Sequence, residues 1–137
     1  MADAGFWLAL ANKKDKHHAR SKQCLRFFNE TLITTWPVMT ETCHLLLNRM
    51  GQHAQQSFIE NYAVGTFEVF QLTDEHALRV VELMNKYADL PMDLADASLV
   101  ILAEHIGHGR IFSTDKRDFH TYRWKHNKPF ENLLFRV

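Results

Sequence analysis

Acidic side chains follow or begin four of the elements that this sequence predicts, namely Asp3, Glu41, Asp96 and Asp115. Asp3 and Asp115 come just after short segments of strand character. Glu41 and Asp96 lie in the first turns of predicted helices. Ligands of open parallel sheets bind beyond the carboxyl ends of the strands, where these four side chains would meet. Crowded carboxylates repel one another unless a cation lies between them, and hard oxygen ligands suit Mg²⁺ or Mn²⁺. One interpretation of the pattern is therefore a metal site.

The same acids also have a structural interpretation, because carboxylates at helix N-termini accept hydrogen bonds from free backbone N–H groups. Asp93-x-x-Asp96 and Asp115-x-x-Asp118 both have the spacing of a capping arrangement. A cap is the simpler role for Asp93 and Asp118. Asp96 is harder to explain in this way, since the two helical turns that follow it are apolar on every face. Spacing alone leaves both interpretations open.

Signatures of other enzyme classes are absent from the sequence. It contains no G-x-G-x-x-G motif, no Walker-type phosphate loop and no G-x-S-x-G nucleophile motif. Nine histidines are present, but no Cys or His partners stand at the spacing of a zinc finger. The carboxylates are therefore the side chains with the clearest chemical potential.

Length and composition fit one globular domain, residues 1–137, with 46% hydrophobic and 23% charged residues. Cys24 and Cys43 form no C-x-x-C pair, which predicts reduced thiols and a cytoplasmic protein. No apolar segment approaches the ~20 residues that span a bilayer, so no membrane association is expected. Basic and acidic residues both total 16, and net charge therefore does not by itself indicate nucleic acid binding.

Apolar periodicity predicts short strands that alternate with helices. Strands are expected up to Asp3 and over 31–34, 66–70 and 110–113. Helices are expected over 16–29, 37–50, 52–63, 73–88 and 93–106. The helix over 93–106 is apolar nearly all round, which is typical of a helix in the middle of a core. Because strands separated by helices require crossover connections, we predict an α/β three-layer sandwich with a short, mainly parallel sheet flanked by helices.

Four short motifs occur in order along the chain: DAGF at 3–6, TTWPV at 34–38, PMDLADA at 91–97 and STDKRDF at 113–119. Together with Glu41 they resemble the motifs of the PIN domain family, and within it the VapC-type toxins of bacterial toxin–antitoxin pairs. The resemblance extends from residue 3 to about residue 133. Two departures are Ala4, where a Ser or Thr is common in the family, and the short segment of only two residues before Asp3.

The resemblance implies a Mg²⁺- or Mn²⁺-dependent endoribonuclease that acts as a toxin, with RNA as substrate, a cognate antitoxin as partner and a homodimer as the usual assembly. It places metal ligands at Asp3, Asp96 and Asp115. Glu41 would bind through water or help to deprotonate the attacking water. Three further residues take secondary positions, namely Asp93, Thr114 (or Ser113) and Asp118. A catalytically inactive scaffold protein of the same fold and a DNA-directed nuclease are the alternatives.

Basic residues are concentrated in two stretches, 13–26 and 110–128, on either side of an acidic middle. Such runs are usually solvated helix faces. In a nuclease, however, cations must bring the phosphate backbone to an acidic pocket, and we predict that both stretches flank the pocket on one face. The predicted RNA-binding residues are Lys116, Arg117, Arg123 and Lys125, with Tyr122, Trp124 and His126 as candidates for stacking on unpaired bases.

Overall fold

The structure is a computed structural model that describes residues 1–136, so Val137, the last residue of the predicted domain, lies outside the described residues. Its α-helices are α1 (Ala4–Ala11), α2 (His18–Arg26), α3 (Trp36–Met50), α4 (Gln52–Ala63), α5 (Ala77–Lys86), α6 (Leu94–Ile106) and α7 (Asp118–Thr121). Two 3₁₀ helices are η1 (Asp74–His76) and η2 (Leu133–Phe135). No helix within residues 1–136 combines the length and apolar character needed to cross a membrane.

The strands are short: β1 (Ile33–Thr35), β2 (Glu68–Phe70), β3 (Arg110–Ile111), β4 (Arg123–Trp124), β5 (Lys128–Pro129) and β6 (Glu131–Asn132). β1 pairs in parallel with β2, and β3 pairs in parallel with β6. Ala2 joins these two pairs, because its N–H donates to the Ile33 carbonyl at 3.1 Å and it forms a parallel bridge with Phe112. The predicted, mainly parallel sheet is thereby confirmed, with the antiparallel β4–β5 hairpin beside it.

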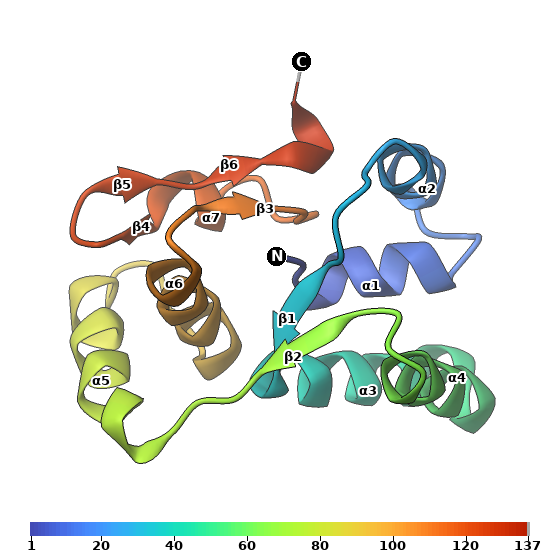
Figure 1. Ribbon diagram of the computed structural model, residues 1–137, viewed down its shortest axis with the longest axis horizontal. Helices are drawn as coiled ribbons and strands as arrows, with labels where there is room; N and C mark the ends of the chain where they lie inside the picture. Colours follow the sequence, from blue (N-terminus) through green and yellow to red (C-terminus); the bar gives the residue numbers. More distant parts are fainter. Residues whose placement is uncertain (137) are drawn as a thin grey trace.

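Helices cover the strands from both sides. In Figure 1, α5 and α6 lie to the left of β1 and β2, whereas α1, α3 and α4 lie to the right. α6 packs against β1, α3 and α5, and its residues from Ala97 to Ala103 are buried. This central position confirms the expectation drawn from its all-round apolar sequence, because a helix without a polar face is stable only where neighbours surround it.

Several predicted boundaries are wrong by a few residues, for local reasons. The helix expected over 16–29 begins only at His18, because Asp15 forms a turn in which its Oδ1 accepts from the His17 N–H at 2.8 Å. Thr73 forms the expected cap, a capping box with His76, but the first turn is the 3₁₀ helix η1. The segment before Asp3 is short but not frayed, since Met1 and Ala2 are buried and paired within the sheet.

Candidate active site

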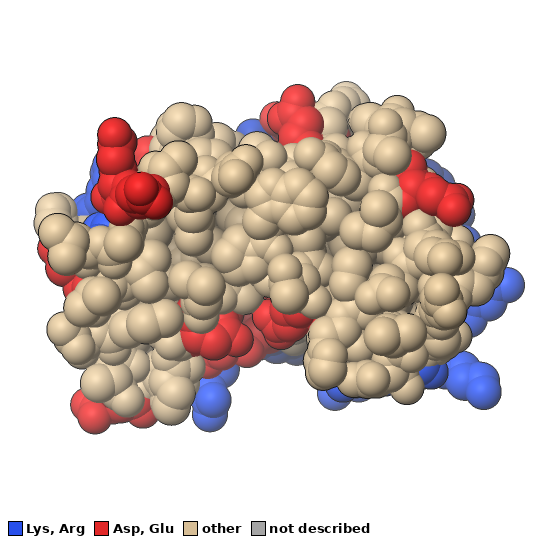
Figure 2. All heavy atoms as spheres, turned by 90° about the horizontal axis from the view of Figure 1, so that it is seen from below, with Lys and Arg blue, Asp and Glu red and all other residues tan. Residues whose placement is uncertain are grey.

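An acidic pocket of about 500 Å³ lies beyond the carboxyl ends of the central strands. The carboxyl side chains that line it are Asp3, Asp15, Glu41, Asp93, Asp96, Asp115 and Asp118. The pocket thus brings together the four acids that the sequence predicts at strand ends or first helical turns: Asp3, Glu41, Asp96 and Asp115. The first and last of them are 112 residues apart in the chain. On the face drawn in Figure 2, acidic side chains border a hollow in the lower edge of the molecule, with basic side chains on either side.

Asp3 is buried and fixed by two hydrogen bonds. It caps α1, with its Oδ1 accepting from the Phe6 N–H at 3.0 Å, while the Ser113 hydroxyl donates to its Oδ2. Burial raises the pKa of Asp3 to about 6, even though both hydrogen bonds favour the charged form. Ser113 also accepts from the Asp115 N–H at 3.0 Å, and so one hydroxyl links two of the pocket's acidic segments.

Asp96 lines the acidic pocket and also takes part in the cap of α6. Asp93 caps α6, accepting from the Asp96 N–H at 2.8 Å, and Asp96 Oδ2 accepts in return from the Asp93 N–H at 3.4 Å. The same Oδ2 accepts from the Tyr122 hydroxyl at 3.2 Å. Burial, together with the charge of Asp93, raises the pKa of Asp96 to about 8. A cation that enters the pocket stabilises the ionised form of such a carboxyl group and lowers its pKa.

Asp115, just before α7, and Asp118, its first residue, form one side of the pocket. Asp115 Oδ1 accepts from the N–H groups of Arg117 at 3.0 Å and Asp118 at 2.9 Å. Asp118 Oδ1 is buried and has no hydrogen-bond partner within residues 1–136, although it forms an ion pair with Arg117, whose Nε lies 3.6 Å away. Burial and the neighbouring Asp115 raise the pKa of Asp118 to about 6. A buried carboxylate oxygen without a hydrogen bond is costly, and a cation closer than Arg117 would reduce this cost.

Thr114 reaches this pocket only because residue 5 is glycine. A Cβ on Gly5 would lie 2.1 Å from Thr114 Oγ1, which is far inside van der Waals contact. The hydroxyl that binds Asp3, however, is that of Ser113 and not Thr114. Of the two hydroxyl residues that the sequence offered, Ser113 therefore positions the acid, and Thr114 lines the mouth of the pocket.

α3 contributes one acid and one base to the pocket. Glu41, Leu45 and Arg49 all line it, since residues four apart lie on the same face of a helix. Burial, and secondarily the charge of Asp93, raises the pKa of Glu41. Arg49 is a pocket residue beyond those predicted from the sequence, although its spacing of eight from Glu41 on one helix was a usable signal.

No three Asp, Glu, His or Cys side chains within residues 1–136 lie close enough together to form a ready-made metal site. The reason is that Asp3, Asp96 and Asp115 are each turned toward local hydrogen-bond donors. The donor set nevertheless fits a hard divalent cation, because it consists of carboxylates, among them the Asp118 oxygen that accepts no hydrogen bond in the described chain. None of the acids Asp3, Glu41, Asp93, Asp96 and Asp115 forms an ion pair with a base of the described chain.

The two basic stretches meet beside the acidic pocket. Lys16 and His17 from the first stretch, with Lys116 and Arg117 from the second, line a shallow pocket of about 650 Å³. This pocket shares Thr114 and Asp115 with the acidic pocket.

Two predicted RNA-binding residues do not lie at the acidic pocket. The Arg123 guanidinium donates to the carbonyls of His120, Thr121 and Tyr122, closing the end of α7. Lys125 lies on the β4–β5 hairpin, where its N–H donates to Glu104.

The proposal that aromatic residues of the same segment stack on bases is wrong for two of the three. Tyr122 is 0% exposed and Trp124 is 7% exposed, so neither ring presents a face to a ligand. Tyr122 is instead in contact with Asp96, and Trp124 Nε1 donates to the Pro129 carbonyl at 3.0 Å. His126 is exposed but belongs to the same hairpin. An aromatic–basic pattern does not distinguish a buried ring from an exposed one.

Comparisons with known proteins agree with this architecture. A ribonuclease of Mycobacterium tuberculosis, VapC26, is 25% identical over 121 residues, which is 88% of this chain and 90% of that protein. The crystal structure of M. tuberculosis VapC20, described as a sarcin–ricin loop cleaving toxin, superposes with a TM-score of 0.79 at 21% identity, covering 85% of this chain and 89% of the other. The model of the PIN domain matches residues 1–125. With the parallel sheet and the acidic pocket at its edge, this match shows that the chain belongs to the PIN domain family.

Proposed function

We propose that this protein is a metal-dependent endoribonuclease and the toxin of a toxin–antitoxin pair. The observation that carries the proposal is the convergence of Asp3, Glu41, Asp96 and Asp115 on one pocket of a PIN domain. Two relatives support it, one named a ribonuclease and the other a toxin that cleaves the sarcin–ricin loop. A binding protein that had lost catalysis would have no reason to keep these mutually repelling carboxylates together.

In this proposal Asp3, Asp96 and Asp115 would hold Mg²⁺ or Mn²⁺, with Asp93 and Asp118 as further acids around it. The bound cation would increase the acidity of water and stabilise negative charge on the phosphate oxygens. Ser113 holds the Asp3 carboxyl in place, and Tyr122 holds that of Asp96. Glu41 on α3 would accept a proton from the attacking water at a carboxylate oxygen, or would bind the cation through water.

Incubation of the purified protein with total RNA and with DNA of matched sequence, with Mg²⁺ and with excess chelator, tests this function. Discrete cuts in RNA that need the divalent cation are expected. Cuts in DNA alone would favour the DNA-directed nuclease, and no cuts in either would favour the inactive scaffold. Mapping the cut ends would also identify the preferred sequence.

Tyr122→Phe is expected to weaken Mn²⁺ binding by about ten- to a hundredfold, because it removes the hydroxyl that orients the Asp96 carboxyl. Isothermal titration calorimetry measures this affinity directly. Tyr87→Phe is the matched control, since the Tyr87 hydroxyl accepts from the Arg123 N–H at 2.8 Å and touches no acid of the pocket. Equal Mn²⁺ affinities for the two variants would show that Tyr122 does not position a metal ligand.

The double variant Lys116→Ala with Arg117→Ala is expected to weaken RNA binding and to flatten its salt dependence. Each lost phosphate contact lowers the slope of log K against log salt by about 0.7 for a single strand, so the pair should lower it by about 1.4. Metal binding should not be weakened, because alanine keeps the backbone N–H that Arg117 donates to Asp115, and the change removes a competing cation from Asp118. An unchanged slope would mean that both side chains belong to a solvated turn.

The proposed partners follow from the proposed activity. A protein that cuts cellular RNA requires an inhibitor, and we propose a cognate antitoxin whose amphipathic segment covers an apolar groove while an Arg or Lys reaches the acidic pocket. We also propose a homodimer as the assembly and the cytoplasm as the location. Growth arrest on expression of this chain alone, relieved by the gene encoded beside it, is the expected result.

A further inference from the structure

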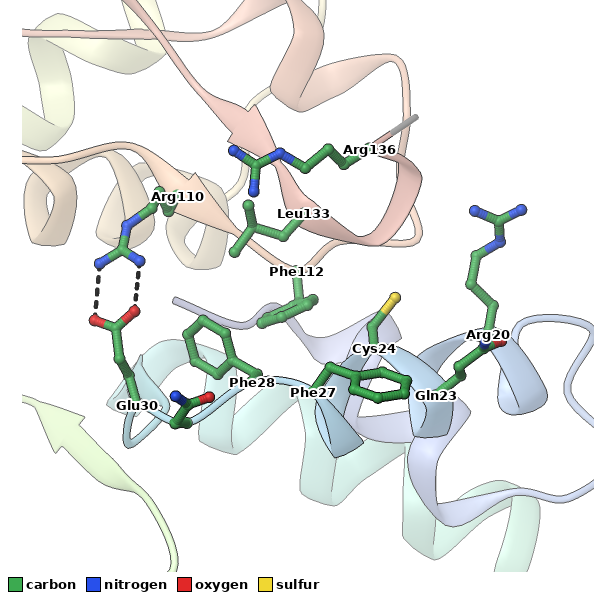
Figure 3. A pocket seen from close by; sticks show the side chains of 11 residues that line it. Arg20, Gln23, Cys24, Phe27, Phe28, Glu30, Arg110, Phe112, Leu133 and Arg136 are labelled. Atoms are coloured by element: carbon green, nitrogen blue, oxygen red, sulfur yellow. Dashed lines mark hydrogen bonds and ion pairs between the residues drawn. The ribbon is translucent and has the colours of Figure 1, made fainter.

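A second groove, of about 810 Å³, lies between α2 and the β3–η2 region. We name it the α2 groove. One face of α2 forms its first wall through Arg20, Gln23, Cys24 and Phe27. Figure 3 shows these side chains opposite Arg110, Leu133 and Arg136, with Phe28 and Phe112 between the two walls. The volume is within the range of sites that hold organic ligands, about 300–1,000 Å³.

The floor of the α2 groove is rigid and aromatic. Phe112 is 2% exposed and stacks on Phe6 with ring centroids 4.8 Å apart, and Phe28 meets Phe112 edge-on at 5.1 Å. Phe27, by contrast, is 75% exposed at the end of α2 and makes no aromatic contact within residues 1–136. A large apolar ring left in water at the edge of a groove is available to stack on a planar ligand.

The charges around the α2 groove are mainly positive. Arg110 forms a two-point ion pair with Glu30, with N–O distances of 2.6 and 2.9 Å, and Arg136 pairs with Glu131. Arg20 has no acidic partner in the described chain, and its guanidinium donates only to the Leu134 carbonyl at 3.2 Å. The groove therefore has three guanidinium groups among its lining residues and a single carboxylate, which favours an anionic ligand.

Phe135 connects the α2 groove with the acidic pocket. The Lys116 ammonium lies 4.2 Å from the centre of the Phe135 ring, and the Arg20 guanidinium lies 5.4 Å from it. His17, which lines the acidic pocket, packs edge-on against the same ring at 5.5 Å. Lys116 and Arg20 thus form a continuous row of positive charge on the Phe135 ring, which extends from the acidic pocket to the α2 groove.

We infer that the α2 groove binds a flanking stretch of single-stranded RNA, whose backbone follows Lys116 and Arg20 and one of whose bases stacks on Phe27. This inference rests on the proposed function and extends it to a second contact region on the substrate. Aromatic rings and cations in alternation are the pattern that single-strand-binding surfaces use, since every base has a π-face and every nucleotide a phosphate. Continuity with the acidic pocket favours RNA over an acidic protein segment.

Fluorescence anisotropy with labelled RNA of about 4 and about 12 nucleotides, on protein carrying Asp96→Asn to prevent cleavage, tests the inference. Phe27→Ala should weaken binding of the longer strand by about tenfold without changing its salt slope, because stacking releases no counterions. Arg20→Gln should weaken it and lower the slope by about 0.7. Neither variant should alter binding of the shorter strand. Leu78→Ala, at another exposed apolar residue, and Arg26→Gln, on α2 outside the groove lining, are the matched controls.

The two cysteines give an independent readout on the same protein. Cys24 lines the α2 groove and Cys43 does not, so the longer RNA should slow alkylation of Cys24 and leave that of Cys43 unchanged. Unchanged affinity and slope in both groove variants, with Cys24 unprotected, would overturn the inference. Because cleavage is measured separately with the unmodified chain, this outcome differs from failure of the proposed nuclease, in which no RNA is cut.

Discussion

Replacing Asp96 with Asn is expected to lower the rate of RNA cleavage by about a hundredfold or more. Asn keeps an oxygen that can accept from the Asp93 N–H and from the Tyr122 hydroxyl, so the cap of α6 should survive. What the change removes is the negative charge, and with it several kcal/mol of the stabilisation that a cation gives to the reacting phosphate. The measurement is the initial rate of cleavage of a mapped RNA site at saturating Mg²⁺.

Asp89→Asn is the control for this experiment, since Asp89 is an exposed acid outside the acidic pocket. It removes the same charge from the chain and should leave the cleavage rate within about twofold of the original, a change of less than about 0.5 kcal/mol. Equal rates for the Asp96→Asn variant and the unmodified protein would assign Asp96 to the cap alone. Equal losses in both variants would point to the net charge of the chain.

Asp96 and Asp3 are expected to destabilise the metal-free protein as the pH rises from about 4 to about 8, whereas the buried Met1 ammonium, whose pKa is lowered to about 5, contributes in the opposite direction. The pKa of Asp96 is raised to about 8 and that of Asp3 to about 6 in the folded chain, whereas both groups ionise near 3.8 when unfolded. Between these values the folded state retains protons that the unfolded state has released. The unfolded state is then favoured increasingly with pH, until the folded groups ionise as well.

Thermal melts in chelator measure this effect. Asp96 is partly solvated, so water screens part of the electrostatic destabilisation that its ionisation causes. A loss of about 2 kcal/mol in the free energy of unfolding would lower Tm by roughly 6 °C. The Asp96→Asn variant cannot ionise at this position, and its Tm should fall less over the same range. Excess Mg²⁺ or Mn²⁺ should restore Tm at the upper end, because a ligand that binds only the folded state stabilises it. The same change of Tm with pH in the Asp96→Asn variant and in the unmodified protein would contradict the proposed crowding of carboxylates, because the Met1 ammonium contributes equally to both.

The sequence alone was sufficient to predict those features that depend on local periodicity. The alternation of strands with helices predicted the parallel sheet, and the all-round apolar segment after Asp96 predicted the buried helix α6. Asp3 and Asp115 could be placed at one edge because residues just after parallel strands must lie there. The order of strands and helices in the sequence therefore determined which carboxylates meet, because residues that directly follow parallel strands lie at the same edge of the sheet.

Only the tertiary structure decided how these carboxyl groups are held. The Tyr122 hydroxyl reaches Asp96 from 26 residues away, and Ser113, not Thr114, contacts Asp3 across 110 residues. Neither contact has a local signature, because both depend on the packing of helix α7 and strand β3 against the rest of the chain. The exposure of aromatic rings was decided in the same way: Tyr122 is enclosed by its neighbours, whereas Phe27 is left in water at the end of α2. Burial is a property of the surroundings in space, which a linear pattern of residue types does not contain.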